Sequence, residues 1–170
     1  TENKNTDKYP ATAKDTAHIL IEAMRIQYPN GTKYVIVKPV NIYGRYDDFN
    51  SPYKMVITSL IDMALKGKIT LYNNGETIRD FINAKDCARG MIEAMEQMPS
   101  NMVNISSGEG ISIKEVAEII SKYTKAPIEY IKKKEITGNK VRILPLNWSF
   151  KPKIKLENGI KEVIDYKNEE

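Results

Sequence analysis

The sequence contains one cysteine and one histidine in 170 residues. Cys87 cannot form a disulfide within the chain, which is typical of a reducing compartment, and we expect a cytoplasmic location. This composition excludes a zinc site built from the usual nitrogen and sulfur ligands, so no metal site is predicted. No apolar run approaches the roughly 20 residues that span a bilayer, and the polar start does not resemble a signal peptide. We therefore expect no membrane partner.

The chain has no strong charge of either sign. Its formal net charge is +4, with 41% hydrophobic and 28% charged residues, which is typical of one globular unit. The small positive excess suits an anionic small ligand, but a solvated lysine-rich surface explains it equally well. The lysines are scattered without interleaved aromatic residues, which disfavours a nucleic-acid-binding module, so no nucleic-acid partner is predicted.

Alternating apolar runs and amphipathic stretches predict an α/β fold with parallel strands. The run 34–37 is rich in β-branched residues and is predicted to be a central, doubly covered strand. Ser112 and Glu115 fit a capping box at the start of a helix. Further strands are expected at 69–72, 81–82, 102–105 and 127–131, and helices at 15–28, 53–66, 86–98, 113–123 and 157–166.

Two polar residues follow predicted strands or turns. Asn41 is expected just past the carboxyl end of the strand 34–37, where open α/β sheets bind their ligands. Arg79 follows the turn 73–75 at the start of another apolar run. The two side chains are candidates to meet over one anionic ligand. The residues alone favour the simpler interpretation, in which Asn41 is a turn residue and Arg79 an exposed charge.

Together these segments resemble the extended short-chain dehydrogenase/reductase family, the NAD-dependent sugar-nucleotide epimerases and dehydratases. Its patterns R-P-x-N-x-Y-G-P and Y-G-x-G-x-x-x-R-D-F-x-x-x-x-D are matched at Pro39, Asn41, Tyr43, Gly44, Tyr72, Gly75, Arg79, Asp80, Phe81 and Asp86. Residues 152–160 are similar to its K-P-x-x-x-L-x-x-G-[IL] segment. The sequence departs from the patterns at Lys38, Arg45 and Asn73, where the family has arginine, proline and glycine. The order and spacing of the motifs make the resemblance specific.

The resemblance implies a partial Rossmann-like parallel sheet plus the small substrate-binding lobe of such enzymes. Residues 1–170 would then form a single α/β unit, the C-terminal half of an NAD-dependent enzyme, with 53–97 and 127–170 in the substrate-binding lobe. The family's G-x-x-G-x-x-G phosphate loop is missing, and Gly108-Glu109-Gly110 is more simply a turn before a capped helix. Most of the NAD pocket is therefore absent, and we expect a homo-oligomer, such as a dimer, or a missing N-terminal half.

The family's catalytic pair is Tyr-x-x-x-Lys, in which the lysine lowers the pKa of the phenol and holds the cofactor ribose. The corresponding residues are Tyr9 and Lys14. The resemblance also implies that Lys14 and Val40 bind the cofactor. Tyr9 stands five residues before Lys14 rather than four, so a regular helix would turn it away from the lysine. The alternative, slightly favoured, is that Tyr9 packs at a helix start and Lys14 is exposed.

The resemblance also implies how a nucleoside-diphosphate sugar is held. Asn41 would hydrogen-bond the phosphate region, Arg79 would pair with the diphosphate, and Tyr72 would lie against the base. Val56 and Ile57 match a helix start that closes over the base. The family often has a second arginine, in the segment that corresponds to residues 136–139. This sequence has no arginine there, and Lys140 and Arg142 are alternative replacements.

Two acidic residues receive structural roles, Asp80 as a partner of Arg79 and Asp86 as the cap of the third helix. The predicted function is the substrate-binding part of a sugar-nucleotide epimerase (an isomerase) or dehydratase (a lyase). The alternative is a non-catalytic nucleotide-sugar-binding or partner subunit without redox activity, which the displaced tyrosine and the missing glycine loop favour.

Overall fold

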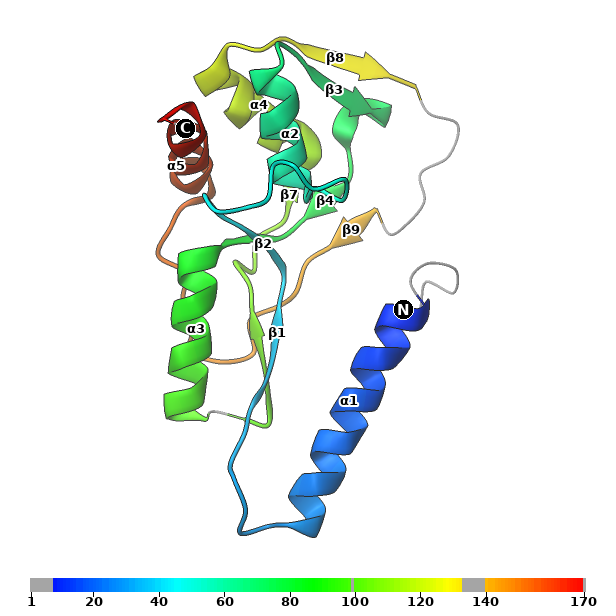
Figure 1. The fold of residues 1–170 in the computed structure, drawn as a ribbon, viewed down its shortest axis with the longest axis vertical. Coiled ribbons are helices and arrows are strands. Elements are labelled where there is room, and N and C mark those ends of the chain that lie inside the picture. Colours follow the sequence, from blue (N-terminus) through cyan, green and yellow to red (C-terminus); the bar gives the residue numbers. More distant parts are fainter. Residues whose placement is uncertain (1–7, 99, 133–139, 170) are drawn as a thin grey trace.

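The computed structural model describes residues 8–98, 100–132 and 140–169 of the 170-residue chain. Its helices are α1 (Lys8–Gln27), α2 (Val56–Leu65), α3 (Ala84–Gln97), α4 (Ile113–Thr124) and α5 (Leu156–Glu169), with the 3-10 turn η1 (Asn73–Gly75). Its strands are β1 (Ile36–Pro39), β2 (Asn41–Tyr43), β3 (Ile69–Tyr72), β4 (Ile78–Arg79), β5 (Phe81–Asn83), β6 (Met102–Ile105), β7 (Ile111–Ser112), β8 (Ile128–Ile131) and β9 (Val141–Arg142). Figure 1 shows their arrangement. The predicted capping box at Ser112 and Glu115 is confirmed.

The strands form small, mostly parallel sheets. β1 pairs with β6, β2 with β5 and β3 with β8, all in parallel, while β4 lies between antiparallel β7 and parallel β9. The predicted α/β fold with parallel strands is thus confirmed. The prediction of a central strand at 34–37 is wrong, because the strand begins at Ile36 and pairs only with β6 within the described residues. A β-branched run indicates that a segment favours burial, but it does not specify which other segments will cover it.

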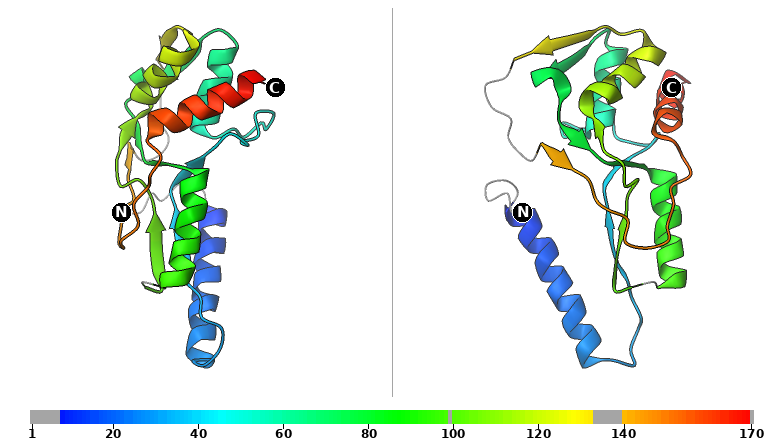
Figure 2. Two further views of the ribbon diagram at one scale, coloured as in Figure 1. Left: turned by 90° about the vertical axis from the view of Figure 1, so that its left-hand side faces the viewer. Right: turned by 180° about the vertical axis from the view of Figure 1, so that it is seen from behind.

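The larger apolar cluster lies between α2, α4, α5 and β3 (Figures 1 and 2). Its members include Ile57, Ile61, Ile69, Val116, Ile120, Ile160 and Val163. A smaller cluster joins α3 to β5 and β6 through Ile82, Cys87, Ile105 and Phe150. Trp148 stacks on Phe150 with ring centroids 5.4 Å apart, so both act as local anchors, as predicted. The turn η1 packs against β3, β8 and α4, beside the larger cluster.

Helix α1 stands apart from the rest of the molecule in Figure 1 and in the right-hand view of Figure 2. It begins at Lys8, seven residues earlier than predicted. Its expected inward stripe is largely exposed, with Leu20 60%, Met24 56% and the following Tyr28 59% accessible. The hydroxyl of Tyr34 donates to the carbonyl of Ile21 and ties the helix to the chain that leads into β1. Within the described ranges, no helix is long and apolar enough to cross a membrane.

Candidate functional site

Tyr72, Arg79 and Val56 line one cleft of about 350 Å³ between α2, β3 and β4. We call it the Arg79 cleft. Its volume lies within the range of small-molecule sites, and its walls are mainly apolar with a few polar groups. The lining residues are Lys54, Val56, Ser59, Leu60, Met63, Thr70, Leu71, Tyr72, Gly75, Thr77, Arg79 and Ile113.

The turn η1 links Tyr72, the last residue of β3, to the segment that carries Arg79 in β4. Three successive residues, Asn73, Asn74 and Gly75, have positive φ angles of 48°, 59° and 66°. Asparagine tolerates this left-handed conformation better than most residues, which explains how Asn73 stands where the family has glycine. Gly75 cannot be replaced easily, because a Cβ there would lie 2.9 Å from the backbone nitrogen of Lys114.

The predicted base-binding residues separate into two environments. Tyr72 is 57% exposed beside the cleft, and Val56, the first residue of α2, is 37% exposed and lines it. Ile57 is 1% exposed and belongs to the larger apolar cluster. Consecutive helical residues differ by about 100° in direction, so only one of the two faces the cleft. Val56 is therefore the better-placed contact.

Asn41 does not line the Arg79 cleft. Its side-chain amide donates to the carbonyl of Asp80, 2.8 Å away, so it supports the strand immediately after Arg79. β2 and β5 are parallel partners, with Asn41 opposite Phe81. Asn41 lies just past the end of β1, as predicted, but it is the first residue of β2 and not a turn residue.

The Arg79 guanidinium lies in a strongly basic setting. It donates to the carbonyl of Ile78 at 2.8 Å, and Arg142 is its register partner in β9. Burial lowers the pKa of Arg79, and the like charge of Arg142 lowers it further. Arginine nevertheless remains protonated in proteins, so the cleft keeps a permanent positive charge. An anion placed here would relieve the repulsion between the two guanidiniums.

The two motif carboxylates are buried and structural, but not in the predicted way. Asp80 was expected to pair with Arg79. Its carboxylate instead accepts hydrogen bonds from Ser107 and Gly108. Asp86 was expected to cap α3, but that cap is Asn83, which accepts from the Lys85 nitrogen.

Tyr9 and Lys14 lie on an uninterrupted α-helix, and Tyr9 is 91% exposed. Five residues in a regular helix correspond to a rotation of about 140°, so the phenol and the ammonium group point to different faces. Lys14 is exposed as well. Neither residue lines the Arg79 cleft. Val40 lies between β1 and β2, where its nitrogen donates to Ile105 at 3.0 Å and its side chain packs on the smaller cluster.

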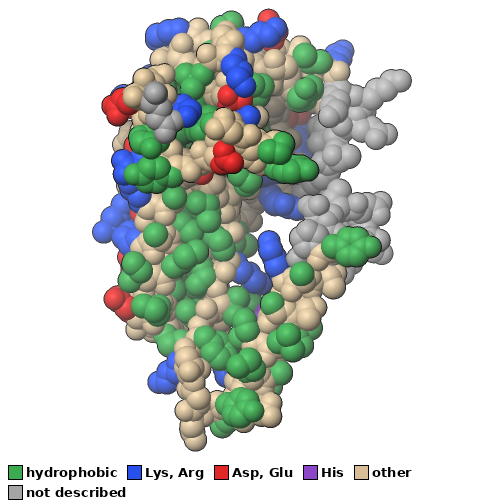
Figure 3. Space-filling view, in the orientation of Figure 1, with side chains coloured by type: hydrophobic (Ala, Val, Ile, Leu, Met, Phe, Trp, Pro, Cys, Tyr) green, Lys and Arg blue, Asp and Glu red, His purple; other side chains and the backbone are tan. Residues whose placement is uncertain are grey.

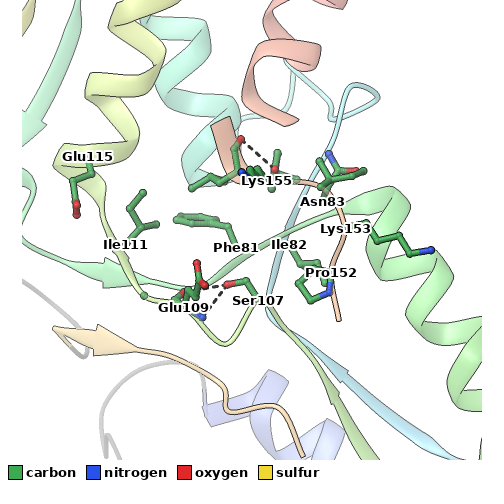
Figure 4. A pocket seen from close by; sticks show the side chains of 14 residues that line it. Phe81, Ile82, Asn83, Ser107, Glu109, Ile111, Glu115, Pro152, Lys153 and Lys155 are labelled. Carbon is green, nitrogen blue, oxygen red and sulfur yellow. Dashed lines mark hydrogen bonds between the residues drawn. The ribbon is translucent and has the colours of Figure 1, made fainter. Parts of the chain in front are cut away.

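A larger cavity, of about 460 Å³, opens near the start of α5 (Figure 4). Three of its polar lining residues, Asn83, Ser107 and Glu115, take part in local structure. The Ser107 hydroxyl donates to Asp80 and accepts from the Glu109 nitrogen, Glu115 accepts the Ser112 nitrogen in the capping box, and Asn83 caps α3. We therefore favour the Arg79 cleft, where an aromatic ring and a cation converge, as the candidate site.

The sequence prediction missed Lys54, Ser59 and Thr77 as lining residues of the cleft. Lys54 forms an ion pair with Asp62 at 3.1 Å on the rim of α2. Thr77 lies two residues before Arg79, and the same alternation that brings Arg79 inward applies to it. The period of two along this short strand was the signal available in the sequence.

Comparison with known proteins identifies a family that the chain matches. The model of the NAD dependent epimerase/dehydratase family matches residues 3–106. Among curated relatives, Probable GDP-L-fucose synthase 1 from Oryza sativa subsp. japonica is 27% identical over 171 residues, covering 92% of this chain and 51% of that protein. GDP-L-colitose synthase from Yersinia pseudotuberculosis is 27% identical over 179 residues, covering 97% and 58%.

The solved structures agree. The UDP-N-acetylglucosamine 4-epimerase from Methanobrevibacter ruminantium M1, in complex with UDP-N-acetylmuramic acid, has a TM-score of 0.84 and 26% identity. That match covers 99% of this chain and 59% of the epimerase. The chain thus spans just over half the length of these relatives. It belongs to the NAD dependent epimerase/dehydratase family.

Proposed function

We propose that this chain is the substrate-binding part of an NAD-dependent sugar-nucleotide epimerase or dehydratase. In this proposal the Arg79 cleft holds the nucleoside diphosphate of a nucleotide sugar. The observation that carries it is the convergence of an exposed aromatic ring, an aliphatic helix start and a guanidinium in one cleft of suitable size. The relative from Methanobrevibacter ruminantium, solved with a UDP-sugar, supports the same ligand class.

Each residue receives a role that its chemistry suits. Tyr72 provides a π-face for the base, and Val56 covers the base from the start of α2. Arg79 provides a planar fork that matches two phosphate oxygens. The Asn41 amide has two N–H groups; one is donated to Asp80, and we assign the other to the phosphate region.

NAD would supply hydride transfer at the sugar, and this chain fits that cofactor only in part. Lys14 and Val40 are the residues we assign to it. The sequence has no G-x-x-G-x-x-G segment to cradle the pyrophosphate. The proposal therefore requires an N-terminal Rossmann half from elsewhere for the redox step, whereas nucleotide binding in the Arg79 cleft uses residues of this chain.

A second candidate function is a nucleotide-sugar-binding or partner subunit without redox activity. The different directions of Tyr9 and Lys14 on α1 favour it. With a complementing Rossmann half and NAD present, an enzyme should lose turnover when Tyr9 is changed to phenylalanine, while nucleotide binding stays unchanged. A binding subunit shows no turnover before or after the change, so the Tyr9→Phe comparison separates the two functions.

The substrate proposal is tested by calorimetric titration of the wild type and Arg79→Lys with UDP-, dTDP- and GDP-sugars. We expect the lysine variant to bind about tenfold more weakly, equivalent to about 1.4 kcal/mol, because the charge remains but the fork geometry is lost. Arg25→Lys is the matched control, since Arg25 forms an ion pair with Glu22 on α1 and is remote from the cleft.

Equal affinities of the wild type and Arg79→Lys would contradict the role of Arg79. The substrate assignment itself fails if the wild type binds none of these nucleotide sugars even when the Rossmann half is supplied.

A further inference from the structure

The cavity of about 460 Å³ near the start of α5 lies where the two apolar clusters meet (Figure 4). We call it the Phe81 cavity. Phe81 of the larger cluster and Ile82 of the smaller cluster line it, together with the partly buried Ile111 and Leu156. Its volume is within the range of small-molecule sites, and it shares no lining residue with the Arg79 cleft. It therefore offers a ligand a separate apolar floor.

Two opposite charges line the Phe81 cavity and are not paired with each other. Glu109 lies in the loop between β6 and β7, and Lys155 lies immediately before α5; both residues are exposed. Within the described part of the chain, their hydrogen bonds are made by backbone atoms, and neither the carboxylate nor the ammonium group takes part in an ion pair. In Figure 4 the two residues lie on opposite sides of the Phe81 ring.

The other two charged lining residues are placed differently. The Glu115 carboxylate accepts from the nitrogen and the hydroxyl of Ser112 in the capping box. The Lys153 side chain points away from the other labelled side chains, toward α3, in Figure 4. The Phe81 cavity therefore combines an apolar floor with an available negative charge on one side and an available positive charge on the other.

This charge pattern distinguishes between classes of ligand. A phosphate or a dicarboxylate would meet Glu109 and Glu115 as like charges, which is unfavourable. A ligand with a single charge would leave Glu109 or Lys155 without a counterion while covering it from water, which costs free energy. A zwitterion gives each of the two groups a charge-assisted hydrogen bond, the stronger kind of hydrogen bond in proteins. The cavity thus favours a small molecule with an ammonium group, a carboxylate and an apolar body.

We propose that the Phe81 cavity binds a zwitterionic amino acid with an apolar side chain, such as phenylalanine or leucine. The ammonium group of the ligand pairs with Glu109 and its carboxylate pairs with Lys155. Its side chain packs on Phe81, Ile111 and Leu156. This site is additional to the proposed function and does not depend on it, because nucleotide binding is assigned to other residues.

The test is calorimetric titration of the 170-residue chain with phenylalanine, leucine and two analogues that each lack one charge. Phenylpropionate lacks the ammonium group, and phenethylamine lacks the carboxylate. We expect the wild type to bind phenylalanine about tenfold more tightly than either analogue, because each analogue leaves one charged group without a partner.

Two variants assign the charges. In Glu109→Gln the affinity for phenylalanine should fall about tenfold, while the affinity for phenylpropionate stays the same. In Lys155→Gln the affinity for phenylalanine should fall similarly, while the affinity for phenethylamine stays the same. The matched controls are Glu118→Gln, which lies outside the cavity, and Lys153→Gln, whose side chain points away from it. Melting temperatures equal to that of the wild type establish that the variants are folded.

The inference is overturned if the wild type binds no apolar amino acid at millimolar concentration, or if it binds phenylalanine and phenylpropionate equally well. Full affinity in both Glu109→Gln and Lys155→Gln would also overturn it, because the amino acid would then lie elsewhere. Arg79→Lys should bind phenylalanine as the wild type does, and a loss there would place the amino acid in the Arg79 cleft instead. None of these results depends on nucleotide binding, so this inference and the proposed function can fail separately.

Discussion

At the scale of single residues, two buried carboxylates join segments that are far apart in the sequence. Asp80 is completely buried and accepts from the nitrogen of Ser107 at 3.0 Å and its hydroxyl at 2.6 Å. Asp86 accepts from the nitrogens of Lys153 and Ile154 at 2.8 and 2.7 Å. The two motif acids therefore fix the loops around β5, and their positions in the motif are explained by backbone recognition rather than by proton transfer.

We predict that Asp86→Asn lowers the free energy of unfolding by about 1–3 kcal/mol at pH 7, because charged hydrogen bonds to two backbone nitrogens and to Arg89 are lost. Burial alone would raise the pKa of Asp86, but the hydrogen bonds from Ile154, Arg89 and Lys153 bring it below its ordinary value of 3.8. A depressed folded-state pKa means that the carboxylate's stabilisation is fully present above the unfolded value and is lost as the pH falls through the folded value.

The measurement for Asp86 is urea unfolding at several pH values. The stability difference between wild type and variant should be constant near neutral pH and shrink below about pH 4. Asp165→Asn is the control, because the Asp165 side chain is 52% exposed and forms an ion pair with Lys161 on the surface of α5. A difference that stays the same down to pH 2 would show that Asp86 acts through its shape rather than its charge.

The candidate site could be predicted in part from residue patterns. The motif placed Tyr72, Arg79 and Val56, and the structure brings these three to one cleft. The resemblance also assigned Ile57 to the base, whereas the helical periodicity placed Ile57 on the inward face, and the structure agrees with the periodicity. The partners of Asp80 and Asp86 were missed because they are 27 and 67 residues away, and side-chain patterns carry no information on such distant contacts.

At the scale of elements, α5 approaches β2 and β5 closely enough to require a glycine. A Cβ added at Gly159 would lie 2.2 Å from the Tyr43 hydroxyl and 3.0 Å from the Asn83 amide nitrogen. Tyr43 is 1% exposed, and its hydroxyl donates to Leu156 O at 3.4 Å. Burial raises the pKa of Tyr43 to about 12, so the phenol remains protonated at this contact. The glycine of the C-terminal motif is thus explained by helix packing.

We predict that Gly159→Ala destabilises the protein by about 1–3 kcal/mol, because the methyl group must displace α5 or the Tyr43 ring. Thermal unfolding of the purified variant measures this loss of stability. Asn158→Ala is the matched control, since Asn158 is exposed on the same helix. Tyr43→Phe removes the clashing oxygen, so the double variant should be less destabilised than the sum of the two single variants. Simple additivity would contradict the proposed contact.

Helices were predictable where their periodicity was strong, as in α2, α3, α4 and α5. Their ends shifted by up to three residues, except where the Ser112 cap marked the start of α4 correctly; the unpredicted cap Asn83 begins α3 two residues early. The strand after α1 was predicted two residues early and as a central strand. Strand position in a sheet depends on pairing with distant segments, and the partner of β1 lies more than sixty residues away.

At the scale of the whole molecule, the part formed by α1, α3, β1 and β6, which is the lower half in Figure 1, presents an uncovered apolar surface. β1 pairs with β6 alone within the described residues, so its other edge offers unpaired backbone groups. On α3, Met91, Ile92 and Met95 are 42%, 53% and 65% exposed. Figure 3 shows hydrophobic side chains over much of this half and along α1. Apolar surface of this extent is typical of a surface that packs against another segment or chain.

We predict that the isolated chain self-associates, because each copy can cover the exposed stripe of α1 in another copy. Sedimentation velocity over a hundredfold range of concentration should show an increasing mass. Leu20→Glu with Met24→Glu should shift the protein toward the monomer, since a charge on each turn of the stripe opposes apolar contact. Asn158→Glu with Asn168→Glu adds the same charge at exposed polar positions of α5, away from the α1 stripe, and should leave association unchanged. If the wild type is a stable monomer throughout this range, the exposed stripe does not drive association. The uncovered half would then have to be stable in water by itself, contrary to the expectation that the chain needs a homo-oligomer or a Rossmann half.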